Sequence, residues 1–189
     1  DCNLDLPLWR LVCASTAAPT YFPPEVVQVG NQQFVFVDGG MTMYNNPAFQ
    51  LFKMATLKPY RLGWQTGEDK MLLVSIGTGF AAEANKNLKA EEMNLIYSAS
   101  SIPAGLMTAA LQEQDLLCRM FGNCRSGDPS TIDLELGGLM PASIPGLEKK
   151  LFTYLRYNAE LTKKGLQELG ISDIEPKHVQ QMDSVDHIA

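Results

Sequence analysis

The segment that most constrains the fold is the short apolar run at residues 71–77, MLLVSIG. It carries no charge and is shorter than an ordinary helix. An unbroken apolar run of this kind is typical of a strand buried on both faces of a parallel sheet. Because helical patterns flank it at 48–57 and 91–121, strands and helices alternate along the chain. We therefore predict an α/β fold with helical layers around a mostly parallel central sheet.

The remaining pattern supports the same class of fold. The apolar runs VVQV and FVFV, separated by GNQQ, predict a β-hairpin. Proline 103 predicts a break in the long helical pattern near residues 101–103. The other predicted elements are helices at 8–18, 147–169 and 176–188 and a strand at 131–136.

Composition excludes several classes of function. The chain has 189 residues, 46% of them hydrophobic, which is enough for one domain with a sizeable core. Its net charge of −6 argues against nucleic acid as a partner, because phosphate binding needs a clustered positive surface. The four cysteines show no CxxC spacing and there are only two histidines, so we expect no metal site. We interpret the cysteines as reduced thiols of a cytoplasmic protein.

The segment VDGG, at residues 37–40, has two interpretations. Asp-Gly is a common turn dipeptide in which the aspartate caps its own backbone, and on this segment alone the turn is favoured. In the alternative, a strand carries the carboxylate of Asp38 to the edge of a sheet, where open α/β sheets place their active sites. Gly39 and Gly40 would then allow a sharp turn beside the carboxylate.

Two neighbouring motifs also have two interpretations each. Asn45 and Asn46 are expected either to support the Asp38 loop by hydrogen bonds or to cap the helix that follows Pro47. The GTG at residues 77–79 suits a strand-exit turn. A phosphate-binding loop is the weaker interpretation, because the lysine of a P-loop is absent.

Three further segments stand out when they are read together: LWRLVCASTAAPTYFPP (8–24), VDGGMTMYNNP (37–47) and LLVSIGTG (72–79). In this order and at this spacing they resemble the patatin-like phospholipases, in particular their bacterial-type members. A fourth, weaker likeness to the same family is LFTYLRYN at 151–158.

The resemblance implies a three-layer α/β fold and a serine–aspartate dyad without a cofactor or metal. The family's DGG aspartate corresponds to Asp38. The family's nucleophile lies in a G-x-S-x-G elbow preceded by a glycine-rich oxyanion segment, and neither motif occurs in these 189 residues. We therefore expect residues 1–189 to be the C-terminal portion of one patatin-like hydrolase domain, whose missing N-terminal part supplies the serine. Alone, the chain is expected to be inactive.

The function predicted on this basis is a lipid acyl hydrolase, a phospholipase or esterase, acting in the cytoplasm. Peripheral contact with a membrane stays open. A non-catalytic or regulatory patatin-fold scaffold is the alternative, and a lost elbow serine would favour it. A nucleotide-binding domain that uses the GTG turn is the third interpretation, and it predicts a nucleotide-dependent thermal shift.

Overall fold

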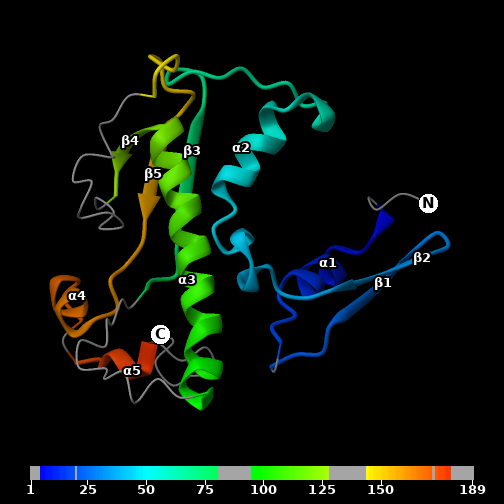
Figure 1. The fold of residues 1–189 in the computed structure, drawn as a ribbon, viewed down its shortest axis with the longest axis vertical. Helices are drawn as coiled ribbons and strands as arrows, with labels where there is room; N and C mark the ends of the chain where they lie inside the picture. The colour runs from blue at the N-terminus through cyan, green and yellow to red at the C-terminus, as the bar shows by residue number, and fades with distance from the viewer. Residues whose placement is uncertain (1–4, 20, 81–94, 128–143, 172, 180–189) are drawn as a thin grey trace.

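The computed structural model describes residues 5–19, 21–80, 95–127, 144–171 and 173–179, and its ribbon is shown in Figure 1. The helices are α1 (Leu8–Ser15), α2 (Ala48–Thr56), α3 (Leu95–Phe121), α4 (Lys163–Glu168) and α5 (Pro176–Val179). The strands are β1 (Glu25–Val29), β2 (Gln32–Phe36), β3 (Leu72–Ile76), β4 (Asn123–Ser126) and β5 (Thr153–Tyr157). Short 3-10 helices are η2 (Gly39–Met41), η3 (Met43–Asn45) and η4 (Lys58–Tyr60).

A parallel sheet forms the centre of the molecule. Its three strands follow the order β3-β5-β4, and β5 pairs in parallel with both neighbours. Helices α2 and α3 pack against the sheet and against each other (Figure 1). This arrangement confirms the predicted α/β fold and the prediction that residues 71–77 form a strand of a parallel sheet.

The core lies on one face of this sheet. Burial alternates along β3, because successive side chains of a strand point to opposite faces. Leu73 and Ser75 are buried against the helices, whereas Leu72 and Ile76 are exposed on the other face. In the described part of the chain, helices therefore cover one face of β3, and the prediction that both faces of this strand are buried was wrong. The core cluster comprises Ala48, Phe52, Met71, Leu73, Cys118, Phe152 and Tyr154.

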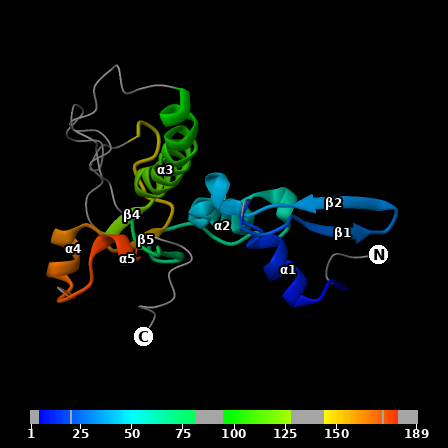
Figure 2. The same cartoon turned by 90° about the horizontal axis from the view of Figure 1, so that it is seen from below.

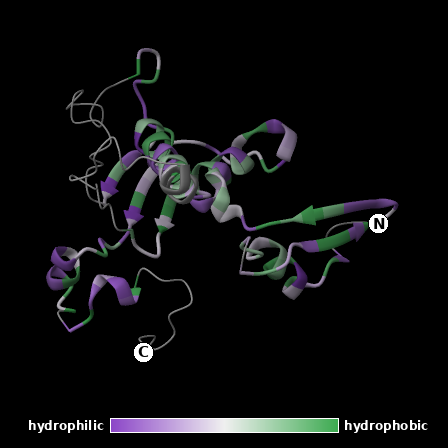
Figure 3. Cartoon of the chain, turned by 60° about the horizontal axis from the view of Figure 1, so that its bottom comes forward, coloured by the Kyte–Doolittle hydropathy of each residue, from purple (hydrophilic) through white to green (hydrophobic). Residues whose placement is uncertain are grey.

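The predicted hairpin is confirmed. β1 and β2 are antiparallel and connected by a tight turn in which Gly30 has φ 59°, a left-handed conformation that favours glycine. The hairpin lies beside α1 and extends away from the parallel sheet (Figures 1 and 2). Its strands are rich in apolar residues (Figure 3), and the side chains of Phe34, Val35 and Phe36 are all exposed.

Two helix predictions were wrong. α3 continues through Pro103, so the expected break is absent; a proline removes only one N–H from a helix of 27 residues. Residues 147–169 were predicted as one helix, but they contain β5 and then α4. The β-branched and aromatic side chains of residues 153–157 favour a strand. The predicted strand at 131–136 and most of the predicted final helix lie outside the described residues.

Candidate active site

Asp38 lies between the hairpin and the helices that follow it. It comes two residues after the end of β2 and caps η2, with its Oδ1 accepting a hydrogen bond of 2.7 Å from the Gly40 amide. Its own N–H donates to the carbonyl of Ala17 at 2.9 Å, which fixes the backbone from a second direction. The residue is half-buried. The local turn expected for Asp-Gly is therefore present, and Oδ2 makes no hydrogen bond to any described residue.

The two glycines after Asp38 fit a tightly folded loop. A Cβ on Gly40 would lie 3.1 Å from Asp38 Oδ1, closer than most real contacts. A Cβ on Gly39 would lie 3.3 Å from the Cβ of Tyr44, which belongs to η3. Side chains at these positions would crowd the carboxylate or the next turn, so the loop favours glycine at both positions.

The two asparagines have different environments. Asn45 is exposed, and its backbone N–H donates to Thr42 within the loop. Asn46 is 1% exposed, and its Oδ1 accepts from Ser75 Oγ at 2.9 Å and from the Ala48 amide at 3.4 Å. The second of these bonds caps the start of α2. Asn46 Nδ2 is also buried, and it has no hydrogen-bond partner among the described residues.

Ser75 connects Asn46 to a buried arginine on the next strand. Arg156 lies opposite Ser75 in the β3–β5 register and donates from Nη1 to Ser75 Oγ at 2.7 Å. The guanidinium is buried, and no described carboxylate lies within ion-pair distance of it. Nothing in the sequence analysis predicted a buried position for Arg156. The side-chain contact depends on strand pairing between segments far apart in the chain.

The GTG segment forms a turn at the end of β3. Asn158 Oδ1 accepts from the Gly79 amide at 2.9 Å. A Cβ on Gly77 would collide with Asn158 and would lie 2.8 Å from Arg156 Nη2. Since a side chain of the protein already binds one of the amides that a phosphate would need, these contacts support the strand-exit turn.

A second buried polar cluster lies between α3 and the sheet. Asp115 accepts from Tyr154 Oη at 2.8 Å and from Arg119 Nε at 2.7 Å. Burial and the charge of Asp115 raise the pKa of the Tyr154 hydroxyl well above its usual range. The same two causes raise the pKa of the buried Cys118 thiol to about 12. Sequence reasoning missed this cluster, although the Asp-Arg spacing of four residues on a helical pattern was a signal for it.

The described residues contain neither a metal-binding cluster nor a membrane-spanning helix. No cluster of three or more histidine, cysteine, aspartate or glutamate side chains there could hold a metal ion. None of the described helices has the length and apolar character needed to cross a membrane.

Comparison with known proteins agrees with the motifs. The chain is 30% identical to patatin-like protein 1 of Arabidopsis thaliana over 172 residues, an alignment that covers 71% of this chain and 40% of the relative. It is 27% identical to patatin-T5 of Solanum tuberosum, over 69% of this chain and 41% of that protein. These likenesses support the patatin-like family. No family model matches the chain.

The alignments cover only part of each relative. The chain spans about 40% of the length of the curated relatives just named. Both of those relatives are plant proteins, so membership of the bacterial-type branch stays a prediction.

Proposed function

We propose that this chain is part of a lipid acyl hydrolase in which Asp38 is the general base of a serine–aspartate dyad. The serine would lie outside these 189 residues, which contain no G-x-S-x-G motif. The observation that carries the proposal is the state of the Asp38 carboxylate. One oxygen is fixed by the Gly40 amide, and the other makes no hydrogen bond to a described residue. A half-buried carboxylate with one oriented and one uncommitted oxygen is suited to receive a proton.

The proposed reaction has two steps. The serine hydroxyl attacks the ester carbonyl while Asp38 takes its proton, and collapse of the tetrahedral intermediate releases the alcohol, which carries that proton away. The base then takes a proton from water, which attacks the acyl-enzyme, and returns that proton to the serine oxygen as the fatty acid leaves, so that both residues regain their starting states. Backbone amides outside this chain would stabilise the oxyanion in both steps. No metal or organic cofactor takes part in this scheme.

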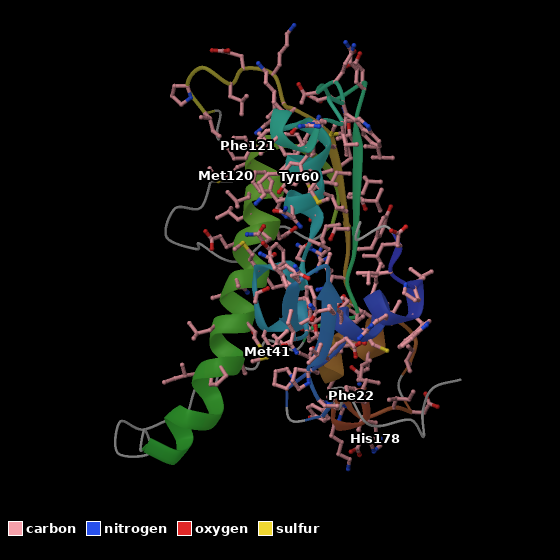
Figure 4. The ribbon with its side chains drawn as sticks, turned by 90° about the vertical axis from the view of Figure 1, so that its right-hand side faces the viewer. Phe22, Met41, Tyr60, Met120, Phe121 and His178 are labelled. Atoms are coloured by element: carbon pink, nitrogen blue, oxygen red, sulfur yellow. The ribbon has the colours of Figure 1, made fainter. Side chains whose placement is uncertain are left out.

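Apolar side chains near the loop suit a lipid ester as substrate. Tyr21, Phe22, Met41 and Met43 are exposed, and they belong to the segments on either side of Asp38. Figure 4 shows Phe22 and Met41 in the same half of the molecule, far from Tyr60 and Phe121. Acyl chains are held by such apolar surfaces with few polar groups. Cytoplasmic placement and peripheral membrane contact belong to this proposal.

The second candidate function is a patatin-fold scaffold without catalysis. The buried polar contacts of Asn46 and Asp115 would serve packing equally well in such a protein. An intact elbow serine in the complete protein supports the hydrolase, and a missing one supports the scaffold.

The proposal is tested with Asp38→Asn in the complete protein. We expect hydrolysis of a phospholipid or p-nitrophenyl ester to fall by about 10²–10⁴-fold, the usual contribution of a general base. Asp173→Asn, a change at an exposed aspartate, is the matched control and should leave the rate unchanged. Full esterase activity in Asp38→Asn would refute the assignment.

The position of the nucleophile has its own test. A fluorophosphonate probe should label a serine outside residues 1–189, as located by mass spectrometry of the labelled peptides. A label on a serine within these residues would overturn the proposed dyad, whereas a folded complete protein that takes no label would favour the scaffold.

A further inference from the structure

We infer that Asn46, Ser75 and Arg156 form a buried tether that positions the Asp38 loop on the parallel sheet. The three are positioning residues, because none of them touches the carboxylate. The effect of the tether on catalysis rests on the proposed function. Its effect on the position of the loop rests on geometry alone.

The loop from Asp38 to Asn46 is held together mainly by bonds within itself. Apart from the bond of Asp38 N–H to the Ala17 carbonyl, its backbone hydrogen bonds join residues three positions apart, such as Met41 N–H to the Asp38 carbonyl and Thr42 N–H to the Gly39 carbonyl. Such bonds fix the shape of a loop but not its position in the protein. Among the described residues, the bond from Ser75 Oγ to Asn46 Oδ1 is the one hydrogen bond that joins this loop to the parallel sheet.

The chemistry of the three groups gives the tether a fixed direction. An arginine can only donate, so Ser75 Oγ must accept from Arg156. The serine proton then points to Asn46, and the amide must turn its oxygen toward the serine. Nδ2 consequently faces away from β3 and stays buried. One arginine therefore sets both the rotation of the hydroxyl and the orientation of the amide.

Both ends of the tether are rigid. Ser75 and Arg156 are paired within adjacent strands, each as the last residue but one, and their side chains are buried on the face covered by α2 and α3. Asn46 also caps α2 through the Ala48 amide, so the loop, the helix and the sheet meet at one amide group. A buried arginine is costly unless it is well satisfied. Its presence here is accounted for if it maintains the geometry of the loop.

The test compares the loss of two hydroxyls in the complete protein. Ser75→Ala breaks the tether. Thr56→Val removes the partly buried hydroxyl on α2 that donates to the Phe52 carbonyl and to no residue of the tether. We expect kcat to fall about 10- to 100-fold in Ser75→Ala with KM unchanged, because a base displaced by about 1 Å can lose that factor. Thr56→Val should keep kcat, and Ser75→Thr, which retains the hydroxyl, should restore most of it.

A second measurement does not depend on activity. Hydrogen exchange at the amides of Asp38 and Gly40, both hydrogen-bonded in the wild type, should accelerate in Ser75→Ala and not in Thr56→Val. If Ser75→Ala does not fold, Asn46→Ala breaks the same bond from the other side and takes its place. Equal exchange and equal kcat in Ser75→Ala and Thr56→Val would overturn the tether.

The two proposals fail in different ways. If Asp38→Asn keeps its activity, Asp38 is not the base, and hydrogen exchange alone decides whether the tether holds the loop. If Asp38→Asn is inactive and Ser75→Ala retains wild-type kcat and exchange, the base is confirmed and the tether is wrong.

Discussion

Two ion pairs with the same spacing allow a direct test of how burial changes the contribution of an ion pair to the free energy of unfolding. Asp115 and Arg119 lie four residues apart on α3, with an Nε–Oδ2 distance of 2.7 Å and side chains 12% and 3% exposed. Lys164 and Glu168 have the same spacing on α4, with an Nζ–Oε1 distance of 3.5 Å and side chains 79% and 65% exposed. The perturbations are Asp115→Ala, Arg119→Met and their combination, with Lys164→Met and Glu168→Ala as the exposed counterpart.

The expected sizes follow from what each change leaves behind. Removing one member of a buried pair leaves the other charge uncompensated, which costs about 3–5 kcal/mol of unfolding free energy. Asp115→Ala also removes the acceptor of the Tyr154 hydroxyl, which adds about 1–3 kcal/mol. The double variant has no unpaired charge, so it should cost less than the sum of the singles, with a coupling of about 2–3 kcal/mol. The exposed pair should show a coupling of about 0.3–0.5 kcal/mol.

The assay is urea unfolding followed by circular dichroism, with the free energy of unfolding taken from the linear dependence on urea. Each pair gives a double-mutant cycle from the wild type, two singles and one double. A coupling for Asp115 and Arg119 no larger than that for Lys164 and Glu168 would refute the reasoning. Additive effects at the buried site would mean that water reaches these groups in the folded protein.

The remaining predictions concern Cys118 and Gly122. The pKa of the Cys118 thiol is raised from 9.0 to about 12, so between these values only the unfolded state loses the proton, and the free energy of unfolding should fall with rising pH. This decline should be shallower in Cys118→Ala by up to about 1.4 kcal/mol per pH unit, as measured by urea unfolding at several pH values; equal slopes would contradict it. Iodoacetamide at pH 8 should modify the exposed Cys13 and spare Cys118, as peptide mass mapping would show. Gly122→Ala, directly after α3, should lower the melting temperature, because its Cβ would collide with the Phe152 ring and lie 2.6 Å from the Cys118 carbonyl oxygen, whereas Gly105→Ala, in open space within α3, should not.

Local patterns in the sequence predicted the elements that depend on neighbouring residues. The β-hairpin, α2 and the apolar strand β3 follow from side-chain periodicity and from glycine and proline positions. The turn at Asp38 follows from its own side chain, which bonds the Gly40 amide two residues away. Where two periodicities overlap, as in residues 147–169, the pattern predicted a helix. Part of this segment forms the strand β5 instead, because it pairs with both β3 and β4.

The candidate site was only partly predictable for the same reason. Asp38, Gly39 and Gly40 were visible as a motif, and their roles in catalysis stay predictions. Arg156 was not visible, because its contact with Ser75 joins residues 81 positions apart through strand register. Likewise, the different burial of Asn45 and Asn46 depends on which of them faces β3. Adjacent identical residues carry no sequence signal that separates them.

The pairing of Ser75 with Arg156 also limits how such a protein can change its length. The side chains of a strand alternate between faces, so one residue inserted within β3 or β5 before these positions would turn one partner to the opposite side of the sheet. Insertions between the two strands would leave the pairing intact, whatever their length. Related proteins should therefore vary freely in the spacing between the two strands, while the number of residues within each strand up to the serine and the arginine stays constant.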